Sequence, residues 1–101
     1  MRPIHLARLD KTRPVLILTR PEVRPHLRSV TVAPITSRVR GLSTEVAVDG
    51  TNGLAQPSVV SCDNITTMPV EQVGRLLGYL RPEQELELSR AVAAAFGLEE
   101  R

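Results

Sequence analysis

Two residues that could act together on a phosphate stand at the ends of two apolar segments. Arg13 precedes the run from Pro14 to Leu18, and Thr36 ends the run that begins at Val30. If these runs are neighbouring antiparallel strands, the guanidinium and the hydroxyl reach the same rim of the sheet. Such a pair would neutralise the charge that builds on a phosphodiester attacked by a 2′-hydroxyl, without a metal. A solvated arginine beside a proline and a strand-forming threonine are the alternative interpretation.

Basic residues are concentrated in the first part of the chain. Residues 1–44 contain eight arginines and Lys11 against Asp10 and Glu22, a net charge of +7, whereas residues 45–101 contain four arginines against nine acids, a net charge of −5. This asymmetry predicts a cationic face for a polyanion and a separate acidic surface. Arginine suits phosphate because its planar fork donates two parallel hydrogen bonds. An ordinary solvated surface explains the same counts equally well.

Length and composition limit the other possibilities. The 101 residues predict one domain, residues 1–101, and two aromatic side chains are too few for a base-stacking platform. Neither histidine has metal-ligand spacing and no glycine-rich loop precedes a helix, so we expect no metal and no cofactor. No apolar stretch approaches roughly 18 residues and no signal-peptide pattern is present, which predicts a cytoplasmic protein without a membrane span. Cys62 is expected to be a small buried hydrophobe.

The pattern of apolar residues, prolines and glycines predicts a mainly β protein with a C-terminal α-helix. Pro14 cannot donate to a ladder, so we expect it to begin its strand. Residues 49–53 contain two glycines and are expected to form a surface loop. Residues 62–67 are expected to continue the fifth strand, and residues 69–74 to contain a helical turn. The expected strands are residues 4–8, 14–19, 29–35, 43–48, 58–61 and 76–80.

The helix has clear signals at both ends. It starts at Pro82, carries acidic residues in its first turn and ends at Gly97. Its buried stripe is expected to contain Leu88, Val92, Ala95 and Phe96. Five or six short strands followed by one amphipathic helix predict a small barrel or twisted sheet with the helix packed on it.

Three segments carry a resemblance to a known family. They are residues 13–19 (RPVLILT), 32–36 (VAPIT) and 58–66 (SVVSCDNIT). Their order and spacing resemble those of the MazF/PemK family, toxins of bacterial type II toxin-antitoxin modules that act as sequence-selective endoribonucleases. The resemblance covers nearly the whole chain, from the Arg-Pro strand to the final helix.

The resemblance implies a homodimer of SH3-like barrels and a specific reaction. It places the family's catalytic arginine on Arg13 and its catalytic threonine or serine on Thr36. It implies metal-independent cleavage of single-stranded RNA, in which the 2′-hydroxyl attacks in line to leave a 2′,3′-cyclic phosphate and a 5′-hydroxyl. The implied partner is a MazE-type antitoxin, whose acidic, disordered tail would lie in the cationic groove.

Five further residues are expected to bind RNA. The family's base-reading positions, usually an acid followed by an amide, fall on Asp63 and Asn64, although the same pair would equally cap a turn. Arg38 and Arg40 stand where the family's loop lines the RNA groove. Lys11 belongs to a connection between two strands that is shorter than in many members.

Two other functions stay open at this stage. The related CcdB toxins use the same barrel to trap gyrase, but they act through a tryptophan-bearing C-terminus, and this chain contains no tryptophan. A barrel that binds RNA without cleaving it would have the same cationic groove.

Overall fold

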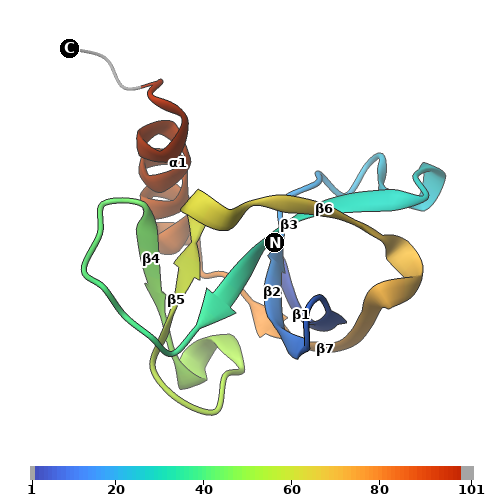
Figure 1. Cartoon of the computed structure of the whole chain (residues 1–101), viewed down its shortest axis with the longest axis horizontal. Helices are drawn as coiled ribbons and strands as arrows, with labels where there is room; N and C mark the ends of the chain where they lie inside the picture. The colour runs from blue at the N-terminus through green and yellow to red at the C-terminus, as the bar shows by residue number, and fades with distance from the viewer. Residues whose placement is uncertain (1, 99–101) are drawn as a thin grey trace.

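The computed structural model describes residues 2–98, so the ends of the expected domain 1–101 lie outside the described residues. Within them, seven antiparallel strands form one curled sheet in the order β4-β5-β3-β2-β1-β7, with β6 also paired to β3, and one α-helix packs against β4 (Figure 1). None of the described helices is long and apolar enough to cross a membrane. The strands are β1 (Pro3–Arg8), β2 (Thr12–Ile17), β3 (Ser29–Thr36), β4 (Glu45–Val48), β5 (Ser58–Ser61), β6 (Thr66–Pro69) and β7 (Val73–Tyr79), and the helix is α1 (Pro82–Phe96). Four short 3-10 turns lie between them: η1 (Arg24–His26), η2 (Gly50–Asn52), η3 (Cys62–Asn64) and η4 (Val70–Gln72).

The sheet separates two hydrophobic cores, because successive side chains of a strand face opposite sides. The larger core lies against α1 and includes Leu16, Ala33, Ile35, Val60 and Leu88. The smaller core consists of Ala7, Val15, Ile17, Val30, Val32 and Met68, with Leu9 and Val73 packed on it.

Both candidate catalytic residues belong to the face of the smaller core. Arg13 is two residues before Val15 in β2, and Thr36 is four residues after Val32 in β3, so each lies on the same side of its strand as that core residue.

A buried pair of amides joins the two edge strands of the curled sheet. Asn52 Nδ2 donates to Gln84 Oε1 (2.8 Å), and Gln84 Nε2 donates to Asn52 Oδ1 (3.2 Å). Gln84 also donates to the carbonyl oxygen of Ala47 in β4 (3.0 Å), and Asn52 to that of Tyr79 in β7 (2.9 Å). Both amides are buried and satisfied, so they stabilise the closure instead of destabilising the core.

Ionic contacts surround this amide pair at the surface. Arg81, which precedes α1, donates to Glu83 (2.8 Å) and to Thr51, and its Nη1 lies 3.7 Å from Asp49. The hydrogen bond to Glu83 raises the pKa of Arg81 and lowers the pKa of Glu83. Hydrogen bonds from Thr51 are the main reason that the pKa of Asp49 is lowered. We call Asp49, Asn52, Arg81 and Gln84 the closing cluster.

Two glycines allow the backbone contact beside the closing cluster. Gly53 has a left-handed φ of 88°, and a Cβ there would overlap the carbonyl oxygen of Leu77. A Cβ on Gly78 would overlap the carbonyl oxygen of Asn52. The predicted loop 49–53 therefore packs its backbone directly on β7, where no side chain fits.

The predicted fold class is confirmed, with seven strands where five or six were expected. Residues 62–67 do not simply continue the fifth strand: they form η3 and then enter β6. The expected helical turn within residues 69–74 is η4. The strand after it starts at Val73, earlier than the expected residue 76, because it extends along β1 as far as Ala7.

The prediction that Pro14 begins its strand is wrong. β2 starts at Thr12, and Pro14 lies opposite Leu6 of β1. On its other side β2 has no partner at this position, since pairing with β3 begins at Val15. The proline is tolerated there because it stands at the end of the pairing between β2 and β3, as at a strand edge.

The helix bounds are confirmed, and one residue of its predicted stripe is wrong. Leu88 is buried, and Val92 and Ala95 pack on the larger core. Phe96 is 59% exposed, because the last turn of α1 projects beyond the sheet (Figure 1). Cys62 is buried as predicted, and desolvation raises the pKa of its thiol to about 11.

Candidate functional site

The site lies where β2 and β3 separate. The two strands pair as far as Val15 opposite Pro34. The next pair in register would join Pro14 to Ile35, but Pro14 has no N–H to donate, so the ladder ends there. Beyond this point β3 pairs with β5 on its other edge. The end of the ladder opens a gap in the sheet between β2 and β3.

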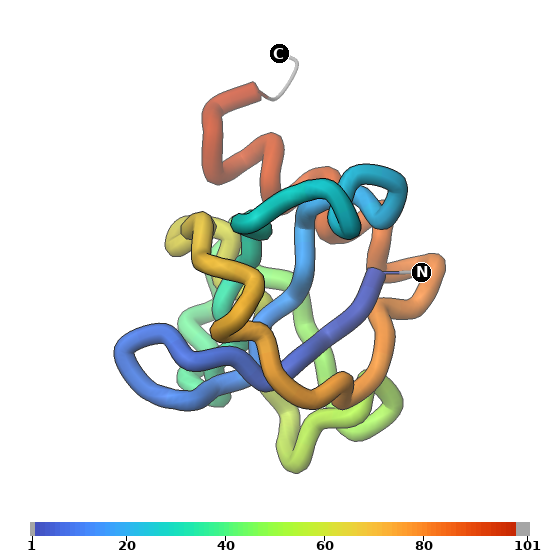
Figure 2. Tube along the Cα trace, turned by 90° about the vertical axis from the view of Figure 1, so that its right-hand side faces the viewer, coloured from blue at the N-terminus to red at the C-terminus, as the bar shows by residue number. Residues whose placement is uncertain are grey.

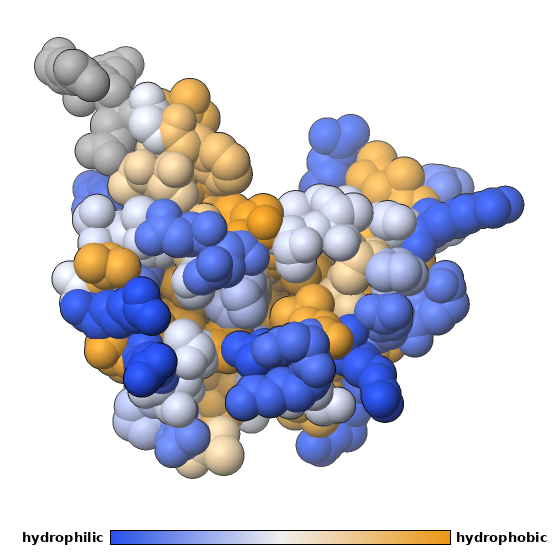
Figure 3. Space-filling view, in the orientation of Figure 1, coloured by the Kyte–Doolittle hydropathy of each residue, from blue (hydrophilic) through white to orange (hydrophobic). Residues whose placement is uncertain are grey.

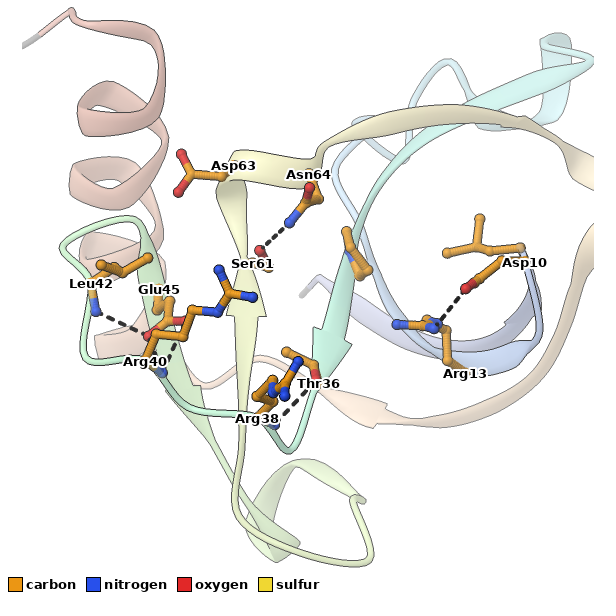
Figure 4. A pocket seen from close by; sticks show the side chains of 12 residues that line it. Asp10, Arg13, Thr36, Arg38, Arg40, Leu42, Glu45, Ser61, Asp63 and Asn64 are labelled. Atoms are coloured by element: carbon orange, nitrogen blue, oxygen red, sulfur yellow. Dashed lines mark hydrogen bonds and ion pairs between the residues drawn. The ribbon is translucent and has the colours of Figure 1, made fainter.

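Arg13 and Thr36 stand on the two sides of this gap. Continued register would make them direct partners, two residues beyond Val15 and Pro34. They also belong to the same face of the sheet, so their side chains face one pocket (Figure 4). The sequence-based expectation that both reach one rim agrees with this geometry.

The pocket has a volume of about 560 Å³ and is open to solvent. In the space-filling view, hydrophilic side chains gather around a hollow on this face (Figure 3). The hairpin of β1 and β2 projects from the rest of the chain (Figure 2), and its residues Asp10 and Arg13 line the pocket. Six of the seven predicted site residues line the pocket: Arg13, Thr36, Arg38, Arg40, Asp63 and Asn64. Lys11 does not, and instead lines a smaller pocket that shares Arg13 and Thr36.

Arg13 keeps most of its donor capacity. Its Nη2 donates to Asp10 Oδ2 at 3.0 Å, and the carboxylate that accepts is 72% exposed. The Nε of Arg13 is buried and has no hydrogen-bond partner within the described residues. An exposed ion pair is weak, so an incoming phosphate can compete with Asp10 for the guanidinium.

Among the described residues, none accepts a hydrogen bond from the hydroxyl of Thr36. Its Oγ1 accepts a hydrogen bond from the backbone N–H of Arg38 at 3.1 Å, which fixes the oxygen at the mouth of the gap. Because a hydroxyl both accepts and donates, Thr36 can still donate to a phosphate oxygen. The pair can therefore supply donors from two sides to one anion.

Asp63 and Asn64 reach the pocket because η3 is extruded from the sheet. With Ile35 opposite Val60, uninterrupted register would put Asp63 opposite Val32, yet Thr66 lies there. Three residues are thus inserted between β5 and β6, and the inserted turn faces the pocket, like an enlarged β-bulge.

The alternative prediction that Asp63 and Asn64 cap a turn is wrong within the described residues, because both side chains bond to other side chains and not to the backbone of η3. Thr44 Oγ1 donates to Asp63 Oδ2 (2.6 Å), and Asn64 Nδ2 donates to Ser61 Oγ (2.8 Å). These bonds orient both side chains without using all of their capacity. Asp63 keeps a second carboxylate oxygen, and Asn64 keeps its amide oxygen and one N–H.

Glu45 is a pocket residue that the sequence interpretation missed. Its Oε1 accepts from the backbone N–H groups of Arg40 (3.2 Å), Gly41 (2.8 Å) and Leu42 (3.1 Å). Gly41 has φ of 76°, so the backbone can turn its N–H groups inward. The carboxylate thereby holds the loop that carries Arg38. The glycine of the turn and an acid four residues later were the available signal.

The charged side chains of the pocket that make no ion pair or hydrogen bond within it are positive. Its three acids are engaged: Asp10 with Arg13, Glu45 with the loop backbone, and Asp63 with Thr44. Within residues 2–98 neither Arg38 nor Arg40 forms an ion pair through its side chain. The described residues contain no group of three or more His, Cys, Asp or Glu that could hold a metal ion.

Fold and site together define a small antiparallel half-barrel with an arginine and a threonine facing each other at one rim. Residues 4–96 match the model of a family described as PemK-like, MazF-like toxins of type II toxin-antitoxin systems. The chain belongs to this family, as the resemblance predicted.

Individual relatives agree with that assignment. The chain is 66% identical over 99 residues to Endoribonuclease MazF3 of Mycobacterium tuberculosis, covering 98% of this chain and 96% of the relative. It superposes on the solved M. tuberculosis toxin MazF-mt6 with a TM-score of 0.96 and 65% identity, over 98% of this chain and 100% of that one. A mycobacterial endoribonuclease solved with its cognate antitoxin gives a TM-score of 0.86 at 26% identity, covering 98% of this chain and 95% of that chain.

Proposed function

We propose that the chain is a toxin that cleaves single-stranded RNA, selectively for sequence and without a metal. The observation that carries this proposal is the placement of Arg13 opposite Thr36 across the gap between β2 and β3, with the Arg13 Nε unpartnered. The relatives named endoribonuclease support RNA as the substrate. As an RNA-cleaving toxin the protein would act in the cytoplasm.

In the proposed reaction the scissile phosphate lies between Arg13 and Thr36. The 2′-hydroxyl gives up its proton to solvent as its oxygen attacks phosphorus in line. The bond from phosphorus to the 5′-oxygen breaks, and the leaving 5′-oxygen takes a proton from Arg13 or from water. The products are a 2′,3′-cyclic phosphate and a 5′-hydroxyl. Arg13 and Thr36 donate to non-bridging oxygens, where negative charge grows in the transition state, and such preorganised donors lower the barrier most effectively.

The other pocket residues would hold and select the RNA. Arg38 and Arg40 are exposed cations on the loop after β3 and would bind backbone phosphates on either side of the reacting one. Asp63 and Asn64 present an acceptor and an amide from η3, which suits hydrogen bonding to base edges. Sequence selectivity would arise from η3, whereas affinity would arise from the arginines.

A MazE-type antitoxin would inhibit by covering this cationic pocket. The mycobacterial relative solved with its cognate antitoxin supports a protein partner of this kind. An acidic segment would compete with RNA for Arg38 and Arg40 and would order on binding. We also propose that the active form is a homodimer of half-barrels.

The direct test is to incubate the purified protein with RNA in EDTA and to analyse the ends of the fragments. Cyclic-phosphate and 5′-hydroxyl ends are expected, and RNA left intact would overturn the proposal. Inhibition of DNA supercoiling by gyrase without RNA cleavage would favour the CcdB-type alternative. RNA binding without cleavage would favour a non-catalytic barrel.

A further inference from the structure

A second pocket adjoins the pair of candidate catalytic residues. It has a volume of about 210 Å³, and Arg13 and Thr36 line it as they line the larger pocket. Its other walls include Lys11 from the hairpin turn, Pro14, Ile35, Leu54 and Gln56. The segment that carries Leu54 and Gln56 runs from η2 into β5, below the ends of β2 and β3 in the view of Figure 1.

The two pockets lie on opposite sides of the Arg13–Thr36 pair. The larger pocket is lined by Pro34, which lies on the same side of β3 as Thr36. The smaller pocket is lined by Pro14 and Ile35, which are adjacent in sequence to Arg13 and Thr36 and therefore face the other side of the sheet. An RNA strand with its scissile phosphate between Arg13 and Thr36 would thus have one pocket for the nucleotide on each side of the bond.

The charges around the smaller pocket favour a nucleotide. Among the described residues that line it, the charged ones are Lys11 and Arg13, both cations. The larger pocket, by contrast, includes Asp10, Glu45 and Asp63. The smaller pocket therefore presents no carboxylate that would repel a phosphate.

The polar and apolar groups of the pocket suit a single base. Ser58 Oγ donates to the carbonyl oxygen of Gln56 at 3.0 Å, which fixes the backbone there. The exposed side-chain amide of Gln56 stays unused by the described residues, and it offers both a donor and an acceptor to a base edge. Leu54 and Pro14 give the face of a base an apolar surface.

We propose that this pocket is the subsite for the nucleotide across the scissile bond from Asp63 and Asn64. Gln56 reads the edge of the base, and Lys11 binds the adjoining phosphate. This inference rests on the proposed ribonuclease function. It makes Gln56 a determinant of base selectivity in addition to Asp63 and Asn64.

The test measures kcat/KM on oligoribonucleotides in which one position at a time around the cleavage site carries each of the four bases. In Gln56→Ala the ratio between the best and the worst base should fall about two- to tenfold at one position, as expected for the loss of one or two hydrogen bonds. Gln56→Glu keeps the acceptor and removes the donor, so it should change which base is preferred. Gln72→Ala, an exposed glutamine of η4 that lines neither pocket, is the matched control and should change no ratio.

The position of the change decides the proposal. Asn64→Ala should alter base preference on the other side of the scissile bond from Gln56→Ala. If the wild type cleaves RNA and Gln56→Ala leaves every base ratio unchanged, the subsite is refuted and the ribonuclease function stands. The same holds if all positions lose rate equally, because reading a base requires a change at one of them. If the wild type cleaves no RNA, the proposed function and the subsite fail together.

Discussion

The pocket around Arg13 and the closing cluster around Arg81 use the same kinds of side chains in opposite ways. Arg81 donates to Glu83 and Thr51 and lies close to Asp49, so its charge is balanced by its own neighbours. Arg13 has one exposed carboxylate partner and an Nε without any partner among the described residues. Arg81 is thus held by neighbouring residues of the fold, whereas Arg13 keeps donors for a ligand.

The amides differ in the same way. Asn52 and Gln84 are buried and bond to each other and to two backbone carbonyl oxygens. Asn64 is exposed and makes one side-chain bond, and the Gln56 side chain lies free at the surface. Satisfied polar groups hold the barrel closed, whereas unsatisfied ones mark the place where a ligand can supply the missing bonds.

The substitution Arg13→Ala should have the largest effect, and it should act on cleavage. Cleavage should fall about 10²- to 10⁴-fold, because the developing charge on the phosphate loses its main donor. The melting temperature should change little, since the ion pair with Asp10 is exposed. Single-turnover cleavage and thermal melts measure both quantities. Arg81→Ala is the matched arginine control, and an equal loss of cleavage there would contradict the division between the two regions.

Substitutions in the closing cluster should lower the free energy of unfolding and leave cleavage by the folded protein unchanged. Asn52→Ala removes the two hydrogen bonds between the amides and the one to the carbonyl oxygen of Tyr79, and should lower the free energy of unfolding by about 2–4 kcal/mol. Chemical denaturation measures this loss. Asn64→Ala is the exposed counterpart and should stay within about 0.5 kcal/mol of the wild type. Cleavage by the folded fraction of the Asn52 variant should be normal, and a stable Asn52 variant would refute the role of the amide pair.

Asp10→Asn tests whether the carboxylate competes with substrate for Arg13. Removing its charge should lower KM by up to about fivefold, the range of an exposed ion pair. The difference should shrink as salt is raised, because salt screens exposed charges. Steady-state kinetics at two ionic strengths give the answer. A higher KM in the variant would show that Asp10 orients Arg13 more than it competes.

The smallest expected effect is the pH dependence of stability that comes from the carboxylates beside Arg81. The folded-state pKa values of Asp49 and Glu83 are lowered, so their contribution to stability is complete above their unfolded values and is lost as pH falls through the folded ones. The melting temperature should therefore decline below about pH 5. Arg81→Ala should flatten this decline slightly. Parallel melts from pH 7 to pH 3 compare the two proteins, and identical slopes would exclude Arg81 as a cause.

Local signals indicated that Arg13 and Thr36 could share one rim, and the family resemblance then selected them as the candidate site. Both stand at strand ends, and the period-two alternation of a strand fixes the face to which each belongs. The helix bounds were equally predictable, because Pro82 and Gly97 act within one turn of the chain. Asp63 and Asn64 were found by family resemblance, since no local pattern distinguishes a polar strand end from an extruded turn.

Contacts between distant segments could not be predicted. Gln84 looks like any polar helix residue until α1 docks beside η2 and brings it to Asn52, 32 positions away. Lys11 lies in the turn between β1 and β2, and the direction of a side chain in such a turn is not set by periodicity. Phe96 has the right spacing for the buried stripe, but the sheet ends before the helix does.

The extruded turn η3 has a consequence for how the chain can vary. β5 and β6 are each aligned against β3 separately, on either side of the insertion. A residue added to or removed from the turn after Cys62 would change the side chains offered to the pocket while both flanking ladders kept their register. Loop length at this point is thus decoupled from the rest of the architecture, so the lining of the pocket can change without a new fold.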